Sequence, residues 1–136
     1  MNKLKLNFLM AAMTTILASG CGSTEESEDG KMVYYDFDKA DIKNEFIEIL
    51  NEEAEFMKSN ADASATIEGH CDSRGTPEYN MALGDRRANA IKKHLEKQGV
   101  TNTIEIKSYG EEKPAVPDAK TEEEHKQNRR AVIIYN

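Results

Sequence analysis

From residue 31 onward, short segments rich in β-branched and aromatic residues alternate with longer segments of helical periodicity. This alternation restricts the fold more than any other feature of the chain. It predicts helices over 41–59 and 77–98, and strands over 32–37, 63–71, 103–109 and 131–135. Residues 111–128 are polar and contain two prolines, so we expect a long loop with one helical turn near 122–126. The order β-α-β-α-β-loop-β predicts an α/β fold (an α+β sandwich), with two main helices packed on one mixed four-stranded sheet.

The two long helices have recognisable ends. Asp41 is expected to cap the first helix. Thr76 followed by Pro77 is a strong start for the second helix, and Gly99 ends it. The first helix also carries an apolar stripe on one face, made of Ile42, Phe46, Ile49, Leu50 and Met57.

Residues 1–20 differ from the rest of the chain. They contain Lys3 and Lys5, no acidic residue, and an apolar run over 8–17 that only two threonines interrupt. A basic start, a short apolar run and a small-residue end are typical of a secretory signal peptide. The run is too short for a transmembrane helix, which needs about 20 apolar residues. We therefore interpret 1–20 as a signal peptide and not as a buried N-terminal helix.

Cys21 follows this segment directly. The sequence LASGC over 17–21 resembles a bacterial lipoprotein box, with Ala18 where leucine is usual. In such a box the cysteine is diacylated and becomes the new N-terminus, and two or more acyl chains anchor a protein stably. The alternative is a plain secreted protein with a disulfide between Cys21 and Cys71. Residues 22–30 are polar and acidic with no apolar residue, which predicts a flexible tether.

The charge of the chain excludes several classes of protein. The formal net charge is −7, and the two lysines of the signal peptide leave −9 for the remainder. Sequence-independent nucleic-acid binding needs phosphate neutralisation by Lys and Arg, so we expect no nucleic-acid partner. Two cysteines cannot build a Cys-rich zinc module, and no glycine-rich phosphate loop is present. We therefore expect no metal and no cofactor, apart from the covalent lipid on Cys21.

The predicted second helix carries a charged residue within its apolar stripe. At 100° per residue, the buried face is defined by Leu83, Ala90, Ile91 and Leu95, and Arg87 lies on the same face. A buried guanidinium is costly without an anionic partner. Asp72, in the loop that leads into this helix, is the candidate partner.

Two interpretations of this pair remain open. Asp72 and Arg87 form a structural ion pair, or each binds one half of a zwitterion. An amino-acid head group carries an ammonium, which a carboxylate can bind, and a carboxylate, which a guanidinium can bind, provided that both protein groups are on rigid elements.

Arg129 and Arg130 begin the last predicted strand. One of them is a candidate to brace the site, and the alternative is a charge pair at the sheet edge.

Several longer motifs carry a family resemblance. Residues 67–80 (IEGHCDSRGTPEYN) and 83–90 (LGDRRANA) resemble the central motif of the OmpA-like peptidoglycan-binding domain. Residues 36–42 (DFDKADI), 108–114 (SYGEEKP) and 128–132 (NRRAV) extend the match over nearly all of 32–135. The signal peptide and tether are similar to those of lipidated members of this family. The resemblance assigns 31–136 as one OmpA-like domain, after a signal peptide (1–20) and a lipidated cysteine with its tether (21–30).

The resemblance implies a function. Family members bind the diaminopimelate end of the peptidoglycan stem peptide without covalent chemistry, and the family aspartate and arginine match Asp72 and Arg87. The resemblance also implies contacts from Asp38, Lys39, Ala40, Arg74, Gly75, Thr76 and Leu83. It places the protein at the cell outer membrane through its lipid, with the domain in the periplasm and a TolB-like protein of the trans-envelope Tol system as a partner. Because both the wall and the chain are anionic, a small shaped site must carry the binding.

Functions other than peptidoglycan binding fit these residues less well. A cell-wall hydrolase would need chemistry from His70, Cys71 and Asp72, but successive strand residues point to opposite faces, so no Cys–His dyad forms. His70 and Asp72 lack the third ligand that a catalytic zinc needs. We therefore predict that the chain is not an enzyme. An OmpA-like structural lipoprotein outside the Tol system is the main alternative, and a small-molecule or metal carrier is a further one.

Cys71 stands where members of the family are expected to have a small residue, and we expect its side chain to be buried.

Overall fold

The computed structural model describes residues 30–136, so the predicted signal peptide, Cys21 and the tether up to residue 29 lie outside the described part. Within the described residues, no helix combines the length and the apolar character needed to cross a membrane. The elements in chain order are β1 (Lys31–Tyr34), a 3₁₀ turn (Asn44–Phe46), α1 (Ile47–Ser59), β2 (Ala65–His70), α2 (Pro77–Lys97), β3 (Ile104–Gly110), α3 (Glu122–Asn128) and β4 (Arg130–Tyr135).

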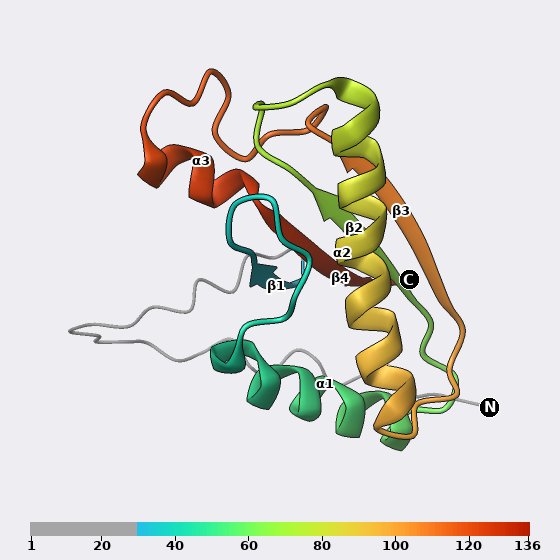
Figure 1. The fold of residues 1–136 in the computed structure, drawn as a ribbon. Helices are drawn as coiled ribbons and strands as arrows, with labels where there is room; N and C mark the ends of the chain where they lie inside the picture. The colour runs from blue at the N-terminus through green and yellow to red at the C-terminus, as the bar shows by residue number, and fades with distance from the viewer. Residues whose placement is uncertain (1–29) are drawn as a thin grey trace, which may run out of the picture.

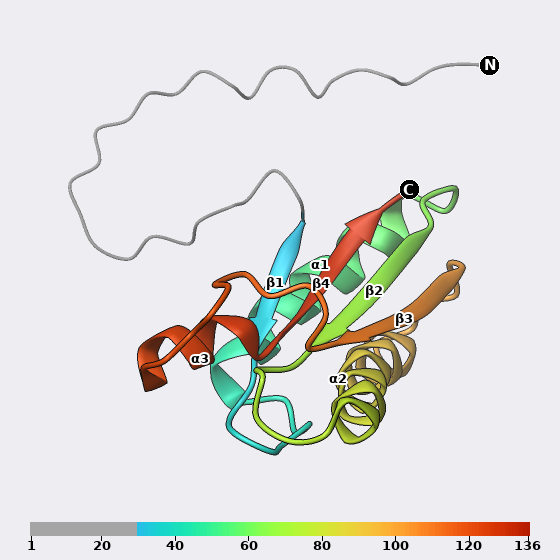
Figure 2. The same ribbon diagram turned by 90° about the horizontal axis from the view of Figure 1, so that it is seen from above.

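The four strands form one mixed sheet in the order β1-β4-β2-β3. β4 pairs antiparallel with both β1 and β2. β2 and β3 are parallel, as expected for neighbouring strands joined by a crossover helix, here α2. α1 and α2 lie on the same side of the sheet, and α3 lies beyond one end of it (Figures 1 and 2). The predicted fold class and element order are confirmed.

The core fills the space between the sheet and these two helices. In β2, Ala65 and Ile67 are fully buried while Thr66 and Glu68 are partly exposed, so side chains over 65–68 alternate between the core and the surface. From α1 the buried apolar residues are Leu50, Ala54 and Met57. The whole core cluster consists of Val33, Tyr35, Leu50, Ala54, Met57, Ala65, Ile67, Ala88, Ile91, Leu95, Val100, Ile104, Ala131 and Ile133.

The start of the first helix differs from the prediction. Asp41 does not cap it, because the chain stays non-helical until the 3₁₀ turn at Asn44–Phe46, and α1 begins at Ile47 without a side-chain cap. The contacts that hold the preceding loop are tertiary: Arg87 of α2 hydrogen-bonds the carbonyl oxygens of Asp36 and Lys39. Those contacts could not be seen in the local sequence.

The ends of α2 and α3 follow local rules. Thr76 caps α2 as predicted, and its hydroxyl accepts a hydrogen bond from the backbone N–H of Tyr79. Gly99 follows the helix with a φ of 100°, a conformation that favours glycine. The expected helical turn near 122–126 is α3, which begins with a capping box between Thr121 and Glu124.

Helix α2 lies unusually close to strand β2 at a pair of glycines. A Cβ added to Gly69 would lie 1.8 Å from the carbonyl oxygen of Gly84. A Cβ added to Gly84 would lie 2.3 Å from Ser108 Oγ and 2.9 Å from the carbonyl oxygen of Gly69. The two backbones therefore touch here without side chains, and this contact sets the distance of α2 from the sheet.

The close approach predicts that Gly84→Ala destabilises the domain. In an exposed helix this change gains about 1 kcal/mol of helix propensity. Here the added methyl group meets two backbone or hydroxyl oxygens, and overpacking of this kind costs about 1–3 kcal/mol. Urea denaturation should show a net loss in the free energy of unfolding. Lys93→Ala, at an exposed position of the same helix, is the control. A Gly84→Ala variant as stable as this control would contradict the close contact.

Candidate ligand-binding cleft

A cleft of about 240 Å³ lies at the end of the sheet where β2 finishes and α2 begins. Its walls come from the loop after β1, the β2–α2 loop, helix α2 and the junction between α3 and β4. The lining residues are Phe37, Asp38, Cys71, Asp72, Arg74, Gly75, Tyr79, Asn80, Leu83, Arg87 and Arg129. Segments far apart in the sequence therefore meet at one small site.

Arg87 lies in the wall of the cleft and has no solvent-exposed surface. Its Nε donates to the Lys39 carbonyl oxygen (2.8 Å), Nη1 to that of His70 (2.9 Å) and Nη2 to that of Asp36 (3.1 Å). The Tyr35 ring centroid lies 5.1 Å from the guanidinium carbon. Burial lowers the pKa of Arg87 from its ordinary value. The prediction of burial is confirmed, but the expected anionic partner is replaced by three main-chain carbonyl groups.

Asp72 is also buried, with 4% of its surface exposed. Its ion pairs are with Arg74 (2.7 Å) and Arg129 (3.1 Å), so the first of the two interpretations, a direct ion pair between Asp72 and Arg87, is wrong. Burial alone would raise the pKa of Asp72, but the hydrogen bonds from Arg74 and Arg129 outweigh it and lower the pKa. Asp72 is therefore a carboxylate at neutral pH.

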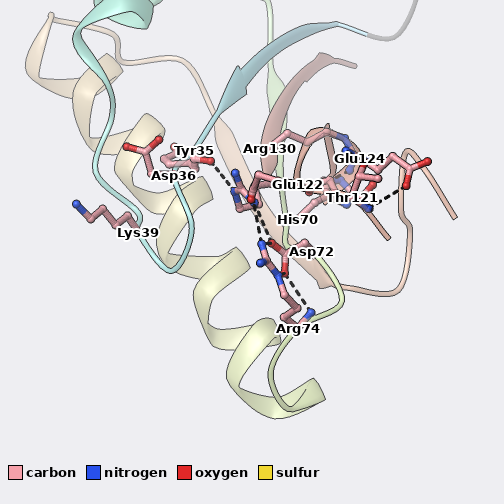
Figure 3. A network of polar contacts seen from close by, with 12 residues as sticks. Tyr35, Asp36, Lys39, His70, Asp72, Arg74, Thr121, Glu122, Glu124 and Arg130 are labelled. Carbon is pink, nitrogen blue, oxygen red and sulfur yellow. Dashed lines mark hydrogen bonds and ion pairs between the residues drawn. The ribbon is translucent and has the colours of Figure 1, made fainter. Parts of the chain in front are cut away.

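A second carboxylate completes this charge cluster. Glu122, in the first turn of α3, lies 2.9 Å from Arg129 Nη1 and 3.6 Å from Arg74 Nη2. Two carboxylates and two guanidinium groups thus form a closed set beside the cleft (Figure 3). Arg129 also donates from Nε to the carbonyl oxygen of Tyr35 (2.9 Å), which ties this set to the end of β1.

The structure brings together most of the residues that the family resemblance singled out. Asp38, Asp72, Arg74, Gly75, Leu83 and Arg87 all line the cleft. Thr76 lies next to it as the cap of α2. Lys39 contributes its carbonyl oxygen to Arg87 and is not among the lining residues. Ala40 lines a separate surface hollow with Arg86.

Several residues of the site were not singled out from the sequence. Phe37 and Tyr79 flank the cleft and are largely exposed, and the Tyr79 hydroxyl donates to the Asp38 carboxylate. Asn80 is buried and donates from its amide to the carbonyl oxygen of Arg74 (3.0 Å) and to Glu111 (2.9 Å). A polar residue on the buried side of an amphipathic helix was the available sign for Asn80. Glu122 gave none, since it lies in an acidic surface run.

Cys71 lines the cleft and forms no disulfide within residues 30–136. It is 3% exposed, and its Sγ lies 3.2 Å from the Asn80 carbonyl oxygen, which accepts the hydrogen bond. Burial raises the pKa of its thiol to about 11, against the opposing effect of the Arg87 charge. The expectation of a buried, shielded thiol is confirmed.

His70 ends β2 and is 2% exposed. Its ring stacks on Tyr109 with a centroid separation of 5.4 Å, and its Nε2 lies 3.4 Å from Glu68. Burial, followed by the positive charges of Arg130 and Lys113, lowers the pKa of His70 to about 4. The imidazole is therefore neutral at pH 7. Its main-chain oxygen is one of the three acceptors that hold the buried guanidinium.

Comparison with known proteins identifies the family. Residues 34–129 match the OmpA family, which is most of the described chain. The chain belongs to the OmpA family. This is a structural family and not an enzyme family, in agreement with the prediction that the chain is not an enzyme. Within residues 30–136, no three His, Cys, Asp or Glu side chains are grouped so that they could hold a metal ion.

The similar proteins include several peptidoglycan-associated lipoproteins. The chain is 40% identical to that of Pasteurella multocida, with 99% of this chain and 100% of the relative covered. It is 38% identical to that of Haemophilus influenzae, with the same coverage. The solved structure of the peptidoglycan-associated lipoprotein from Burkholderia pseudomallei matches with a TM-score of 0.75 at 38% identity, covering 77% of this chain and 89% of that one.

A more distant structure shows the same fold. The C-terminal domain of Helicobacter pylori MotB matches with a TM-score of 0.69 at 20% identity, covering 76% of this chain and 81% of that one. The resemblance to the OmpA-like domain, stated from the motifs, is thus confirmed at the levels of family and fold.

The hydrogen bonds from Arg87 to three main-chain carbonyl groups predict that this residue is needed for stability. Arg87→Ala removes a fully buried side chain together with its hydrogen bonds to three main-chain carbonyl groups, and we expect a loss of about 3 kcal/mol or more in the free energy of unfolding. Urea denaturation measures this loss. Arg86→Ala, at the exposed neighbouring position, should cost less than about 0.5 kcal/mol. Equal losses for the two variants would contradict the structural role of Arg87.

Burial of His70 predicts a pH dependence of stability. The unfolded chain titrates near 6.5 and the folded chain at about 4, so on acidification the unfolded state binds the proton first. The free energy of unfolding should therefore fall between pH 6.5 and 4, by up to about 3 kcal/mol.

Urea denaturation of His70→Gln at several pH values tests this prediction. The fall between pH 6.5 and 5 is the informative part, because the carboxylates near the site titrate mainly below that range. His94→Gln is the comparison, since burial lowers the pKa of His94 as well. A His70→Gln variant that keeps the full wild-type slope would show that His70 is not its source.

Proposed function

We propose that this chain is an outer-membrane lipoprotein that binds peptidoglycan non-covalently and tethers the outer membrane to the cell wall. The observation that carries the proposal is one small cleft lined by a buried carboxylate, Asp72, and a buried guanidinium, Arg87. The relatives named peptidoglycan-associated lipoprotein, about 40% identical over almost the whole chain, support the same reading.

The ligand in this proposal is the zwitterionic end of diaminopimelate in the stem peptide. Three of the five N–H groups of Arg87 bind carbonyl groups, and the proposal assigns the remaining two, one on each terminal nitrogen, to the ligand carboxylate. Because Arg87 is fully buried in the free protein, the side chains over it must move aside for this contact. The Asp72 carboxylate takes the ligand ammonium. Opposite charges on the two sides of the cleft match the two poles of the ligand and reject ligands with a single charge.

The anchor lies at the other end of the tether. The signal peptide directs export, and Cys21 carries the lipid that holds the protein in the inner leaflet of the outer membrane, with the domain in the periplasm. If the segment 22–30 is the flexible tether that its composition predicts, it has an r.m.s. reach of roughly 15–18 Å. Two attachments joined by so short a tether raise the effective concentration of the domain at the wall.

We further propose that the protein is the Pal component of the Tol-Pal system and contributes to envelope integrity and cell division, with a TolB-like periplasmic protein as its partner. A pull-down with purified TolB from the same organism tests this part separately. Wall binding without TolB binding would leave the protein as a structural envelope lipoprotein outside the Tol system.

Wall binding itself is tested by co-sedimentation of the full chain, in detergent, with purified sacculi. Wild type should pellet with the sacculi. Asp72→Asn removes the charge but keeps the shape, and Arg129 retains Glu122, so the domain should stay folded while binding falls at least tenfold. Asp72→Asn is preferred to Arg87→Ala, because Arg87→Ala also removes the hydrogen bonds to three main-chain carbonyl groups and so destabilises the fold.

Asp62→Asn, an exposed carboxylate of the turn between α1 and β2, is the matched control and should bind as wild type does. Circular dichroism checks that each variant is folded. A folded Asp72→Asn variant that pellets like wild type would refute the zwitterion site, and a wild type that stays in the supernatant would refute wall binding.

A further inference from the structure

The Asp72 carboxylate has no free acceptor position. Its Oδ1 accepts from the backbone N–H (3.1 Å) and the Nε (3.3 Å) of Arg74. Its Oδ2 accepts from Arg74 Nη2 (2.7 Å) and Arg129 Nη1 (3.1 Å). A carboxylate offers about four lone-pair positions, and four are occupied here. A ligand ammonium can therefore bind Asp72 only by displacing a donor.

The two guanidinium groups differ in how easily they can leave. Arg129 is 5% exposed in its side chain and is also bonded to the Tyr35 carbonyl oxygen and to Glu122. Arg74 is 40% exposed and comes from the loop before α2, so its release costs less burial. Arg74 is therefore the donor that gives way.

Glu122 offers the released guanidinium a second carboxylate. Its Oε1 lies 3.6 Å from Arg74 Nη2, against 2.7 Å for Asp72 Oδ2. Glu122 is 52% exposed in its side chain, so it can accept a further hydrogen bond. The Phe37 ring, 4.3 Å from the Arg74 guanidinium carbon, supports the same side chain from its face. Figure 3 shows Arg74 beside Asp72. Glu122 is the first residue of α3.

We propose that Arg74 is a latch on the cleft: it occupies Asp72 when no ligand is bound, and it transfers to Glu122 when a ligand ammonium takes its place. This inference rests on the proposed function of the cleft and adds how its occupancy is controlled. Since only a cation can replace a guanidinium on Asp72 at low cost, the latch admits ligands with a free ammonium and excludes acylated ones. Glu122 acts as a positioning residue, because it binds Arg74 and not the ligand.

The latch predicts that loss of Arg74 strengthens binding. We expect Arg74→Gln to bind a soluble stem peptide with free diaminopimelate up to about fivefold more tightly, the usual range for one exposed ion pair. Arg74→Lys restores the positive charge and should return the affinity toward that of wild type. Weaker binding by Arg74→Gln would show that Arg74 is a direct ligand contact, and would overturn the latch.

Glu122→Gln supplies the second arm, and isothermal titration calorimetry of the full chain in detergent measures both. Without the second carboxylate Arg74 has nowhere to transfer, so Glu122→Gln should weaken binding by up to about fivefold. In the Arg74→Gln background the same change should have no effect. Glu123→Gln, an exposed carboxylate of the same helical turn, is the matched control and should bind as wild type does.

The outcomes separate the latch from the proposed function. A wild type that does not bind the stem peptide refutes the function, and the latch with it. The function stands if wild type binds the stem peptide and Asp72→Asn does not. If Glu122→Gln then weakens binding equally with and without Arg74, Glu122 acts through Arg129, and only the latch is refuted. The Arg74 Nε–H signal in NMR spectra is an independent readout: ligand should shift it in wild type and shift it differently in Glu122→Gln.

Discussion

The rest of the site depends on the burial of one guanidinium group. Arg87 reaches from α2 to three carbonyl oxygens, two in the loop after β1 and one at the end of β2. A buried cation without such acceptors would cost several kcal/mol, so the loop must keep the backbone conformation that presents them. Two residues of the loop between these acceptors, Phe37 and Asp38, form one wall of the cleft.

The charged groups beside the cleft are arranged in nearly neutral sets. Asp72 and Glu122 together balance Arg74 and Arg129, and each guanidinium contacts both carboxylates. Only Asp72 and Arg129 of this set are buried, and their mutual attraction, together with the contacts of Arg74 and Glu122, offsets the cost of desolvating them. If the proposed function is correct, a charged ligand binds by exchange with a group already present and not by filling an empty charged pocket.

Helix α2 connects the fold to the site. Its position against the sheet is set where Gly69 and Gly84 meet backbone to backbone. One turn later it supplies Arg87, and at its N-terminus Thr76 and Asn80 shape the loop that carries Asp72. A helix that lay farther from the sheet would carry the guanidinium away from its acceptors. Packing and binding geometry are thus determined by the same contact.

The sequence by itself determined the element order, the ends of α2, the turn that became α3 and the burial of Arg87, because periodicity and capping depend on residues close together in the chain. The family motifs also singled out six of the residues that line the cleft. Only the tertiary structure decided the partners: carbonyl groups for Arg87, Arg74 and Arg129 for Asp72, and Glu122 for both arginines. Those partners come from segments up to 57 residues apart, and no local pattern reports which distant group will satisfy a buried charge.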